Sequence, residues 1–355
     1  MALVMYLVQI PLVEPIIKFL LGVPVIGPIV EFLMWEPVFA VWFLPGLVGL
    51  FVVLIYTIWW ERKAAGRVQW RYGPLQISRR TGGIIQPVSD LIRYMLQEII
   101  LPDEANMPYF LHVPVLAFFV ALTPLLFLPA GPHLIAIYTP YNILIVVVLL
   151  SIFNLAMVAM GWASNDKWAF IGTVREALVY VSYEVSFMAS VISMLILYAT
   201  ADPFRAVSSQ SMLPGAIMNP VAFLLAIITT AMATDRYPFE IVTNESDVVA
   251  GPFTEYGGLM FGLTMTVTYE KGYIMSLLIS LLFLGGWSGP YIWILGDLSP
   301  AFWLGFRVFL LMMFFSFLRA VYPNYRLDQV LKMGWKTLLA LSVVSLIISM
   351  AWRVL

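Results

Sequence analysis

The sequence has no cysteine and only two histidines among its 355 residues. A chain without cysteine can form no disulfide, can hold no thiolate-bound iron–sulfur cluster and can build no cysteine-type zinc site. His112 and His133 each lie near the end of an apolar run, where packing or an interfacial position is the usual role of a histidine. The sequence therefore predicts no metal site and no cofactor bound by ligands of its own.

Charge is also scarce. Only 11% of the residues are charged and 62% are apolar, whereas an ordinary soluble domain carries roughly 25% charged residues. The net charge is −1 and no basic tail is present, so a nucleic-acid partner is not expected. A surface this poor in charge needs a lipid bilayer as its solvent.

Long apolar runs are what the sequence has instead. A helix needs about 20 apolar residues to cross a hydrocarbon core of about 30 Å. The pattern predicts an all-α fold, a polytopic transmembrane helix bundle, with residues 38–355 forming a single transmembrane domain. The eight predicted spans are 38–60, 109–129, 141–163, 176–200, 219–238, 260–287, 300–320 and 335–354.

Residues 1–37 are apolar, but five prolines interrupt them. Proline breaks a helix interior, so this segment is predicted to be interfacial or re-entrant, with a ninth span as the alternative. The N-terminus has no basic stretch followed by a small-residue cleavage site, so no removable signal peptide is expected. The prolines are Pro11, Pro15, Pro24, Pro28 and Pro37.

The basic residues predict the orientation of the bundle. With eight spans, most of the 19 Lys and Arg belong to the loops after the odd-numbered spans or to their helix ends, whereas Lys18, Arg205, Arg307 and Arg353 lie on the other side. The positive-inside rule places those loops in the cytoplasm and both termini on the outer face of what we expect to be a prokaryotic cell membrane.

A segment of the first of these loops, residues 84–100, has apolar residues at helical spacing and one polar stripe. The stripe contains Gln86, Asp90, Arg93 and Gln97. This pattern predicts an amphipathic helix that is too charged to span the membrane. The helix lies in the cytoplasmic interface or, alternatively, lines a cavity shared with a partner.

Acidic residues occur where a membrane protein should avoid them. Glu184 lies within the fourth span, with Glu176 and Tyr180 on the same helix face. Intramembrane acids usually face a polar cavity or a partner charge, and clustered acids can share protons. A second group of carboxylates follows the fifth span, namely Asp235, Glu240, Glu245, Asp247 and Glu255. For Glu245 and Asp247 the alternative is an ordinary loop position.

Several motifs, taken in order, resemble the H-type membrane subunit family of respiratory complex I (NADH:quinone oxidoreductase), the family that forms the quinone chamber. They cover the chain from about residue 40 to its end. The motifs are ERKAAGRVQWRYGP at 61–74, QPVSDLIRYMLQE at 86–98, GWASNDKWAFIGTVRE at 161–176, SYE at 182–184, DRYPFE at 235–240, ESDVVAGPFTEY at 245–256, FLGGW at 283–287 and RAVYPNYRLDQVLKMGWK at 319–336.

The resemblance implies a proton relay and a quinone chamber. The relay acids would be Glu184, Glu240, Glu245, Asp247 and Glu255, and Glu176 joins them because it shares a helix face with Glu184. The residues near the quinone chamber or its interface with the soluble arm would be Glu61, Arg62, Gln69, Arg71, Asp90 and Arg236. Basic residues in this loop could instead serve only to anchor the chain.

The same resemblance implies partners. These are the soluble redox subunits of a peripheral arm, the antiporter-like and small membrane subunits, the lipid bilayer and quinone, a substrate at a shared site. Iron–sulfur clusters would lie only in partner chains, so the chain would be a subunit of a translocating oxidoreductase that is not catalytic alone.

The chain departs from the family at Ala233 and Thr243, which stand where relay acids are usual, and these changes indicate a divergent branch. One alternative is the equivalent subunit of an energy-converting hydrogenase or ferredoxin-linked complex without a quinone. A stand-alone ion transporter and a purely structural anchor are the others, although no internal repeat favours the transporter. The electron donor and the choice between H⁺ and Na⁺ remain open.

Overall fold

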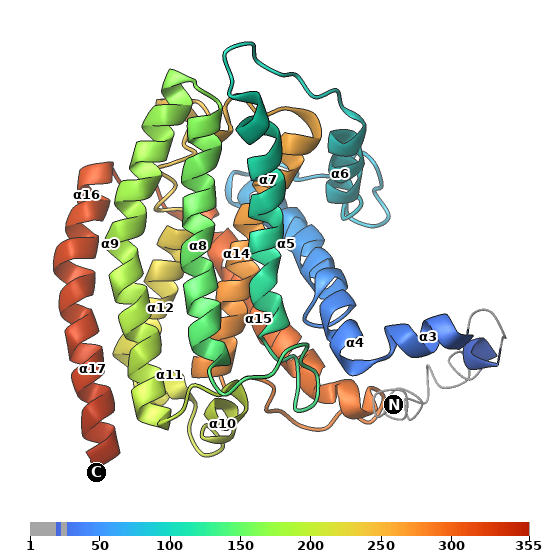
Figure 1. The fold of residues 1–355 in the computed structure, drawn as a ribbon, viewed down its shortest axis with the longest axis vertical. Coiled ribbons are helices and arrows are strands. Elements are labelled where there is room, and N and C mark those ends of the chain that lie inside the picture. The colour runs from blue at the N-terminus through green and yellow to red at the C-terminus, as the bar shows by residue number, and fades with distance from the viewer. Residues whose placement is uncertain (1–18, 23–26, 355) are drawn as a thin grey trace.

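The computed structural model describes residues 19–22 and 27–354, and within these residues the regular structure is entirely helical, as predicted (Figure 1). Most of the N-terminal segment predicted to be interfacial, residues 1–18 and 23–26, lies outside the described residues. In chain order the elements are α3 Gly27–Leu33, α4 Glu36–Trp42, α5 Leu47–Val68, α6 Gln86–Leu96, α7 Met107–Leu122, the 3-10 turn η1 Thr123–Leu126, α8 Asn142–Ala163, α9 Lys167–Tyr198, α10 Pro203–Ser208, α11 Gly215–Met218, α12 Pro220–Ala233, α13 Glu245–Val248, the 3-10 turn η2 Gly251–Phe253, α14 Gly258–Phe283, the 3-10 turn η3 Gly296–Leu298, α15 Ser299–Val321, α16 Leu327–Lys332, the π-helical segment η4 Met333–Leu338 and α17 Leu339–Val354.

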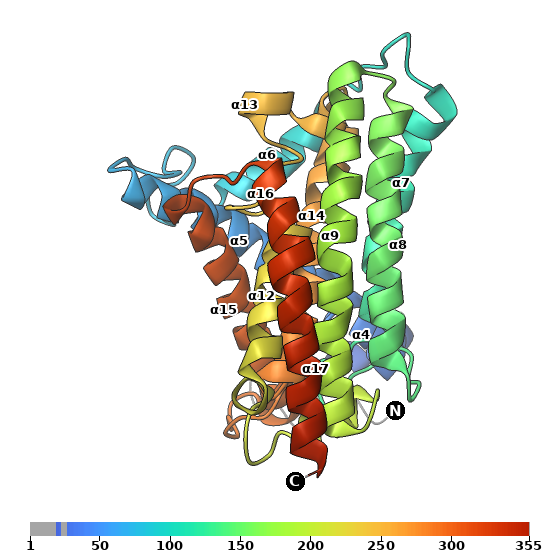
Figure 2. The same cartoon turned by 90° about the vertical axis from the view of Figure 1, so that its left-hand side faces the viewer.

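Six helical segments in the described residues are long and apolar enough to cross a membrane. They are Glu36–Val68, Met107–Leu126, Asn142–Ala163, Lys167–Tyr198, Gly296–Val321 and Leu327–Val354. The other two predicted spans correspond to α12, which is apolar but has 14 residues, and α14, which has 26 residues and carries two adjacent charges, Glu270 and Lys271. The count of eight therefore stays a prediction, although both helices run inside the bundle (Figures 1 and 2).

The loops alternate between the two ends of the bundle in the order that eight spans would give. One end carries α6, α13 and the start of α16, and the other carries α10, α11 and the C-terminal end of α17 (Figures 1 and 2). The first end contains the predicted cytoplasmic loops, and we call it the loop-rich end.

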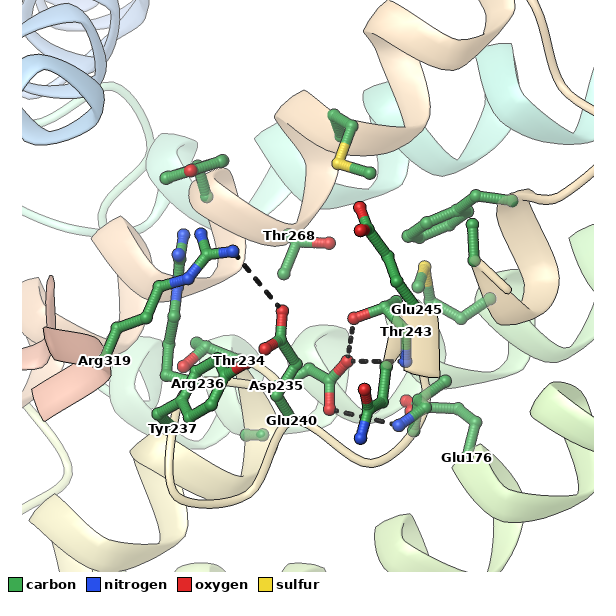
Figure 3. Close-up of a pocket in the computed structure, with 18 of the residues that line it drawn as sticks. Glu176, Thr234, Asp235, Arg236, Tyr237, Glu240, Thr243, Glu245, Thr268 and Arg319 are labelled. Atoms are coloured by element: carbon green, nitrogen blue, oxygen red, sulfur yellow. Dashed lines mark hydrogen bonds and ion pairs between the residues drawn. The ribbon is translucent and has the colours of Figure 1, made fainter. Parts of the chain in front are cut away.

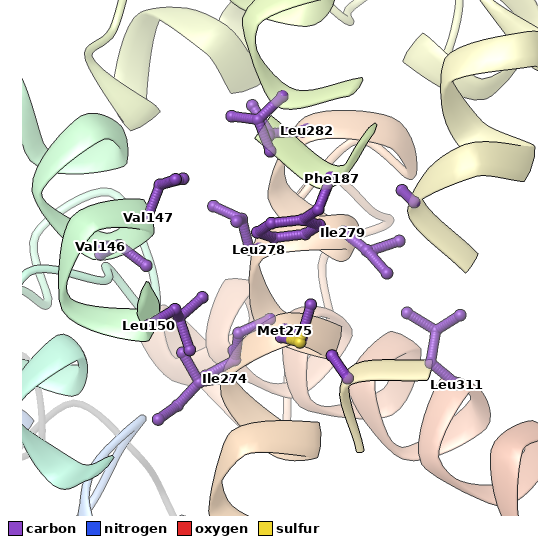
Figure 4. Close-up of a cluster of buried hydrophobic side chains, with 14 of the residues drawn as sticks. Val146, Val147, Leu150, Phe187, Ile274, Met275, Leu278, Ile279, Leu282 and Leu311 are labelled. Carbon is purple, nitrogen blue, oxygen red and sulfur yellow. The ribbon is translucent and has the colours of Figure 1, made fainter. Parts of the chain in front are cut away.

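The core forms around α14, which is buried along its C-terminal half. Ile274, Leu278 and Leu282 of this helix pack with residues of α8, α9 and α15 (Figure 4). In a bilayer this packing acts mainly through close van der Waals contact, and it holds α14 rigidly where its polar half passes the candidate site.

Two elements differ from their predicted bounds. α9 begins at Lys167 rather than at residue 176, because Asp166 caps it by accepting hydrogen bonds from the backbone N–H groups of Trp168 and Ala169. The amphipathic helix, α6, covers Gln86–Leu96 instead of 84–100, since Gln97 is already extended. Glu176 therefore lies in the third turn of a long helix and not at its start.

Candidate functional site

A cavity of about 580 Å³ opens at the loop-rich end, where the 234–250 loop meets α14, α8, α9 and the end of α15 (Figure 3). One part of its lining is apolar, with Phe153, Met157, Phe253, Phe261 and Met265. The other part is charged or polar, with Glu176, Asp235, Arg236, Glu240, Glu245, Tyr269 and Arg319. Small-molecule sites combine an apolar wall with a few convergent polar groups in this way.

Glu61 organises the charged wall from behind. Its side chain is only 6% exposed, its Oε2 lies 2.9 Å from Arg236 Nη1, and its Oε1 accepts a hydrogen bond from Arg319. Tyr269 donates to the same carboxylate at 3.2 Å, and the Arg236 guanidinium lies 4.1 Å from the centre of the Tyr269 ring. One carboxylate thus fixes two guanidinium groups that both face the cavity, and a buried charge requires such compensation.

Asp235 shapes the loop that closes the cavity. Its backbone adopts a φ of 47°, which turns the chain so that the carboxylate accepts hydrogen bonds from the backbone N–H groups of Ile241 and Thr243 at 3.0 and 3.1 Å. The Thr243 hydroxyl donates to Asp235 Oδ2 at 2.5 Å. Thr243, which departs from the family pattern, therefore supplies a donor where a second carboxylate would repel Asp235.

Burial controls the electrostatics of this loop. It raises the pKa of Asp235 above its ordinary value, although the hydrogen bonds from Thr243 and the neighbouring amides oppose the rise. Burial also raises the pKa of Glu240, while Arg319, 3.7 Å away, opposes the shift. Both acids favour proton uptake more than exposed carboxylates do, so the cavity wall takes up protons more readily than a surface loop.

A second cavity of about 260 Å³ adjoins the first and shares Phe261, Met265 and Tyr269 with it. It lies between α5, α6 and α14. Arg62 of α5 and Asp90 of α6 form an ion pair of 2.5 Å in its wall. The amphipathic helix α6 thus directs Asp90, part of its polar stripe, toward a cavity that opens beside the charged wall.

Below the first cavity the acids continue into the bundle. Glu176 lines the cavity, and Glu184 lies eight residues further along α9, about 12 Å at 1.5 Å per residue. Both side chains are buried. Glu184 accepts a hydrogen bond from Ser151 of α8, so it points into the α8–α9 interface rather than toward lipid.

The predicted residues divide into two groups. The structure brings Arg236, Glu240, Glu245 and Glu176 together at the first cavity, with Glu61 paired to Arg236 behind its wall, and Arg62 and Asp90 at the second. Glu184 lies deeper along α9, and four others lie away from both cavities. Gln69 and Arg71 are exposed and hydrogen-bonded to each other at 2.7 Å, Asp247 is 3.5 Å from Arg175 in a shallow outer hollow, and Glu255 is half-buried in the loop before α14.

Sequence reasoning missed two residues of the charged wall and two buried charges in α14. Arg319 and Tyr269 hold Glu61, and they are distant from it in sequence. Glu270 and Lys271 are both buried at the midpoint of α14, and adjacent charges within a predicted span were a signal that could have found them. Neither carboxylate oxygen of Glu270 has a hydrogen-bond partner among the described residues.

Comparison with known proteins gives the family. The model of the NADH dehydrogenase family matches residues 42–350. The H subunit of the NADH-quinone oxidoreductase of Cupriavidus metallidurans is 32% identical over 320 residues, which cover 86% of this chain and 89% of that protein. The corresponding protein of Polaromonas sp. is 31% identical, with 86% and 88% covered, and that of Dehalococcoides mccartyi is 33% identical, with 84% and 81% covered. The match spans nearly the whole described bundle, including both cavities, and the chain therefore belongs to the NADH dehydrogenase family, as an H-type membrane subunit.

Proposed function

We propose that this chain forms part of a quinone chamber in a proton-translocating oxidoreductase and carries the first acids of a relay from that chamber into the membrane. The proposal rests on one observation: charged groups continue from the cavity wall into the bundle along α9. Arg236 and Arg319, which Glu61 holds from behind, face the same cavity as Glu176, and Glu184 follows Glu176 along α9.

The cavity suits a quinone in size and chemistry. About 580 Å³ lies within the range of small-molecule sites, roughly 300–1,000 Å³. Phe253, Phe261 and Met265 offer apolar contact to a ring and tail, whereas Arg236, Arg319 and Tyr269 offer donors to carbonyl oxygens. The adjoining cavity between α5, α6 and α14 supplies a route from the bilayer interface. The quinone would be a substrate held with partner chains, which would also supply the redox centres.

Charge coupling supports the relay. Reduction of a quinone takes up protons and changes the charge at the cavity wall, where Asp235 and Glu240 carry raised pKa values because they are buried. A change of charge there alters the field at Glu176, which lines the same cavity, and interacting acids titrate as a group. Proton uptake at the wall is thus transmitted to the buried acids of α9.

The quinone assignment is tested by photolabelling the purified complex with an azido-quinone. Labelled peptides are expected from residues 257–271 of α14 and from the 234–250 loop, and excess unlabelled decylubiquinone should abolish the labelling. A complex that retains its redox partners but neither binds nor reduces the quinone would contradict the chamber and favour the ferredoxin-linked alternative.

The relay is tested by Glu184→Gln in the complex reconstituted into proteoliposomes. Glutamine keeps the shape and can still accept from Ser151, so assembly is expected to be unchanged, whereas the pH gradient formed per electron should be lost because the side chain can no longer carry a proton. Fluorescence quenching by an acridine dye measures the gradient. Asp297→Asn, an exposed acid at the opposite end of the bundle, is the control. An unaltered proton-to-electron ratio in Glu184→Gln would contradict the relay.

A further inference from the structure

Lys271 is a buried cation that neither the family resemblance nor the proposed chamber uses. It lies at the middle of α14 and is 2% exposed. Lysine is almost never fully buried unless it is paired, and an unpaired buried charge costs several kcal/mol. Its position inside the bundle therefore requires compensation from nearby groups.

The direct partners of the ammonium are neutral. Lys271 Nζ donates to Asn154 Oδ1 of α8 at 2.5 Å and to the Tyr183 hydroxyl of α9 at 2.9 Å, and Tyr183 in turn donates to the same Asn154 oxygen at 3.1 Å. Within the described residues no carboxylate lies within ion-pair distance of it, although Glu270 is adjacent in sequence. These hydrogen bonds hold the lysine in place, and its charge is not paired with any single acid.

Three acids surround this anchored charge at longer range. Lys271 interacts electrostatically with Glu176, Glu184 and Asp235. Its ammonium also lies 4.9 Å from the centre of the Phe153 ring, and Phe153, Glu176 and Asp235 all line the first cavity. On the deeper side, Asn154 follows Ser151, the partner of Glu184, by one turn of α8. The cation thus lies between the cavity and Glu184.

We propose that Lys271 is the positioning residue of the relay, a single fixed positive charge shared by the cavity acids and Glu184. One ammonium cannot fully compensate three carboxylates in a low dielectric. When Glu176 or Asp235 takes up a proton at the cavity, the field of Lys271 becomes available to Glu184, which then ionises and releases its proton. One proton is bound and one is released, with no change at Lys271. This role rests on the proposed relay function.

The test replaces the charge while keeping the side chain long. Lys271→Met in the reconstituted complex is expected to lower the pH gradient per electron at least fivefold, while the redox rate with an uncoupler stays within about twofold. Lys271→Arg, which retains the charge, should restore at least half of the gradient. A role in packing alone predicts no difference between the two variants. Ser276→Ala, a buried position of the same helix whose hydroxyl has no partner among the described residues, is the matched control.

Two further arms cover the remaining cases. If Lys271→Met does not assemble, Tyr183→Phe is the alternative, because it removes only the hydroxyl that holds the ammonium. It should lower the pH gradient per electron about twofold or more, while the redox rate with an uncoupler stays within about twofold. Wild-type coupling in Tyr183→Phe, or in an assembled Lys271→Met, would overturn the inference. Glu184→Gln measured in parallel separates the two proposals: if it loses the gradient while Lys271→Met retains it, only the role of Lys271 fails.

Discussion

Glu61 shows how one residue sets the charge of a whole cavity wall. Its carboxylate contacts Arg236, Arg319 and Tyr269, which come from the 234–250 loop, α15 and α14. These elements all meet α5 here, at the loop-rich end. The residue therefore joins α5 to the site without entering the cavity itself, and its loss would leave two guanidinium groups without their main counter-charge.

Glu61→Gln is accordingly expected to destabilise the assembled complex. Removing one member of a buried ion pair costs about 3–5 kcal/mol, because the remaining charge stays buried. The measurement is the thermal midpoint of the detergent-solubilised complex. Asp328→Asn is the control, since Asp328 and Arg326 form an exposed pair with side chains 66% and 80% accessible, worth about 0–1 kcal/mol. Equal midpoints for the two variants would show that Glu61 does not hold the cluster.

The sequence predicted which acids are important better than how they are arranged. Glu61 and Arg236 were both predicted to lie near the chamber, and they form an ion pair of 2.9 Å. Arg319 could not be assigned to them, because 258 residues separate it from Glu61 and no local pattern reports such a contact. Thr243 stands where the resemblance implies a relay acid, and the sequence did not indicate that its hydroxyl donates to Asp235. The residue type at one position therefore says little about which neighbouring side chain will pair with it.

At the scale of elements, close backbone contact positions the cavity loop against α9. A Cβ atom at Gly172 would lie 2.6 Å from Gly251 Cα, and a Cβ at Gly251, whose φ is 57°, would lie 2.0 Å from the Val242 carbonyl oxygen. Only glycine permits this approach. The α9 helix and the segment from Val242 to Gly251 are thereby packed backbone to backbone beside the acids of the cavity.

Gly172→Ala should therefore displace the loop and weaken quinone-analogue binding at least tenfold, with a lower thermal midpoint, because the added methyl group meets backbone atoms that cannot rotate away. Gly305→Ala is a matched control within α15, where a Cβ would meet nothing within 4 Å, and it should stabilise by about 0.5–1 kcal/mol through helix propensity. Wild-type binding by Gly172→Ala would show that the contact does not shape the cavity.

The helices themselves were largely predictable, since apolar length marks a span wherever charge is absent. The start of α9 was not, because its first three turns, KWAFIGTVRE, carry charges that resemble a loop, and only the Asp166 cap signals a helix there. α14 shows the opposite case, a predicted span that contains charges. Its buried Glu270 and Lys271 depart from the composition of a lipid-facing helix, which is possible because neighbouring helices, not lipid, surround that half of it.

At the scale of the whole molecule, the alternation of loops makes the bundle strongly asymmetric in charge. The first loop, residues 69–85, joins the 234–250 loop and the start of α16 at the loop-rich end (Figure 2). Among the described residues, the Lys and Arg belong to this end except Lys271, at the middle of α14, and Arg205, Arg307 and Arg353, toward the other end. The positive-inside rule therefore predicts that both cavities lie on the cytoplasmic side, where we expect soluble redox partners to reach them.

Because the chain has no cysteine, a single introduced cysteine can report this orientation, and no native cysteine has to be removed first. Single variants Ser78→Cys, in the first loop, and Met212→Cys, between α10 and α11, place a thiol at opposite ends of the bundle, and Met212 is 94% exposed. A membrane-impermeant maleimide should label Met212→Cys in intact cells. It should label Ser78→Cys only in inverted vesicles washed with a chaotrope, because soluble partners would otherwise cover that loop. The opposite pattern would reverse the orientation. Labelling of both thiols from one side would contradict the alternation of the loops, since the three helices α7, α8 and α9 could not then all cross the bilayer between residues 78 and 212.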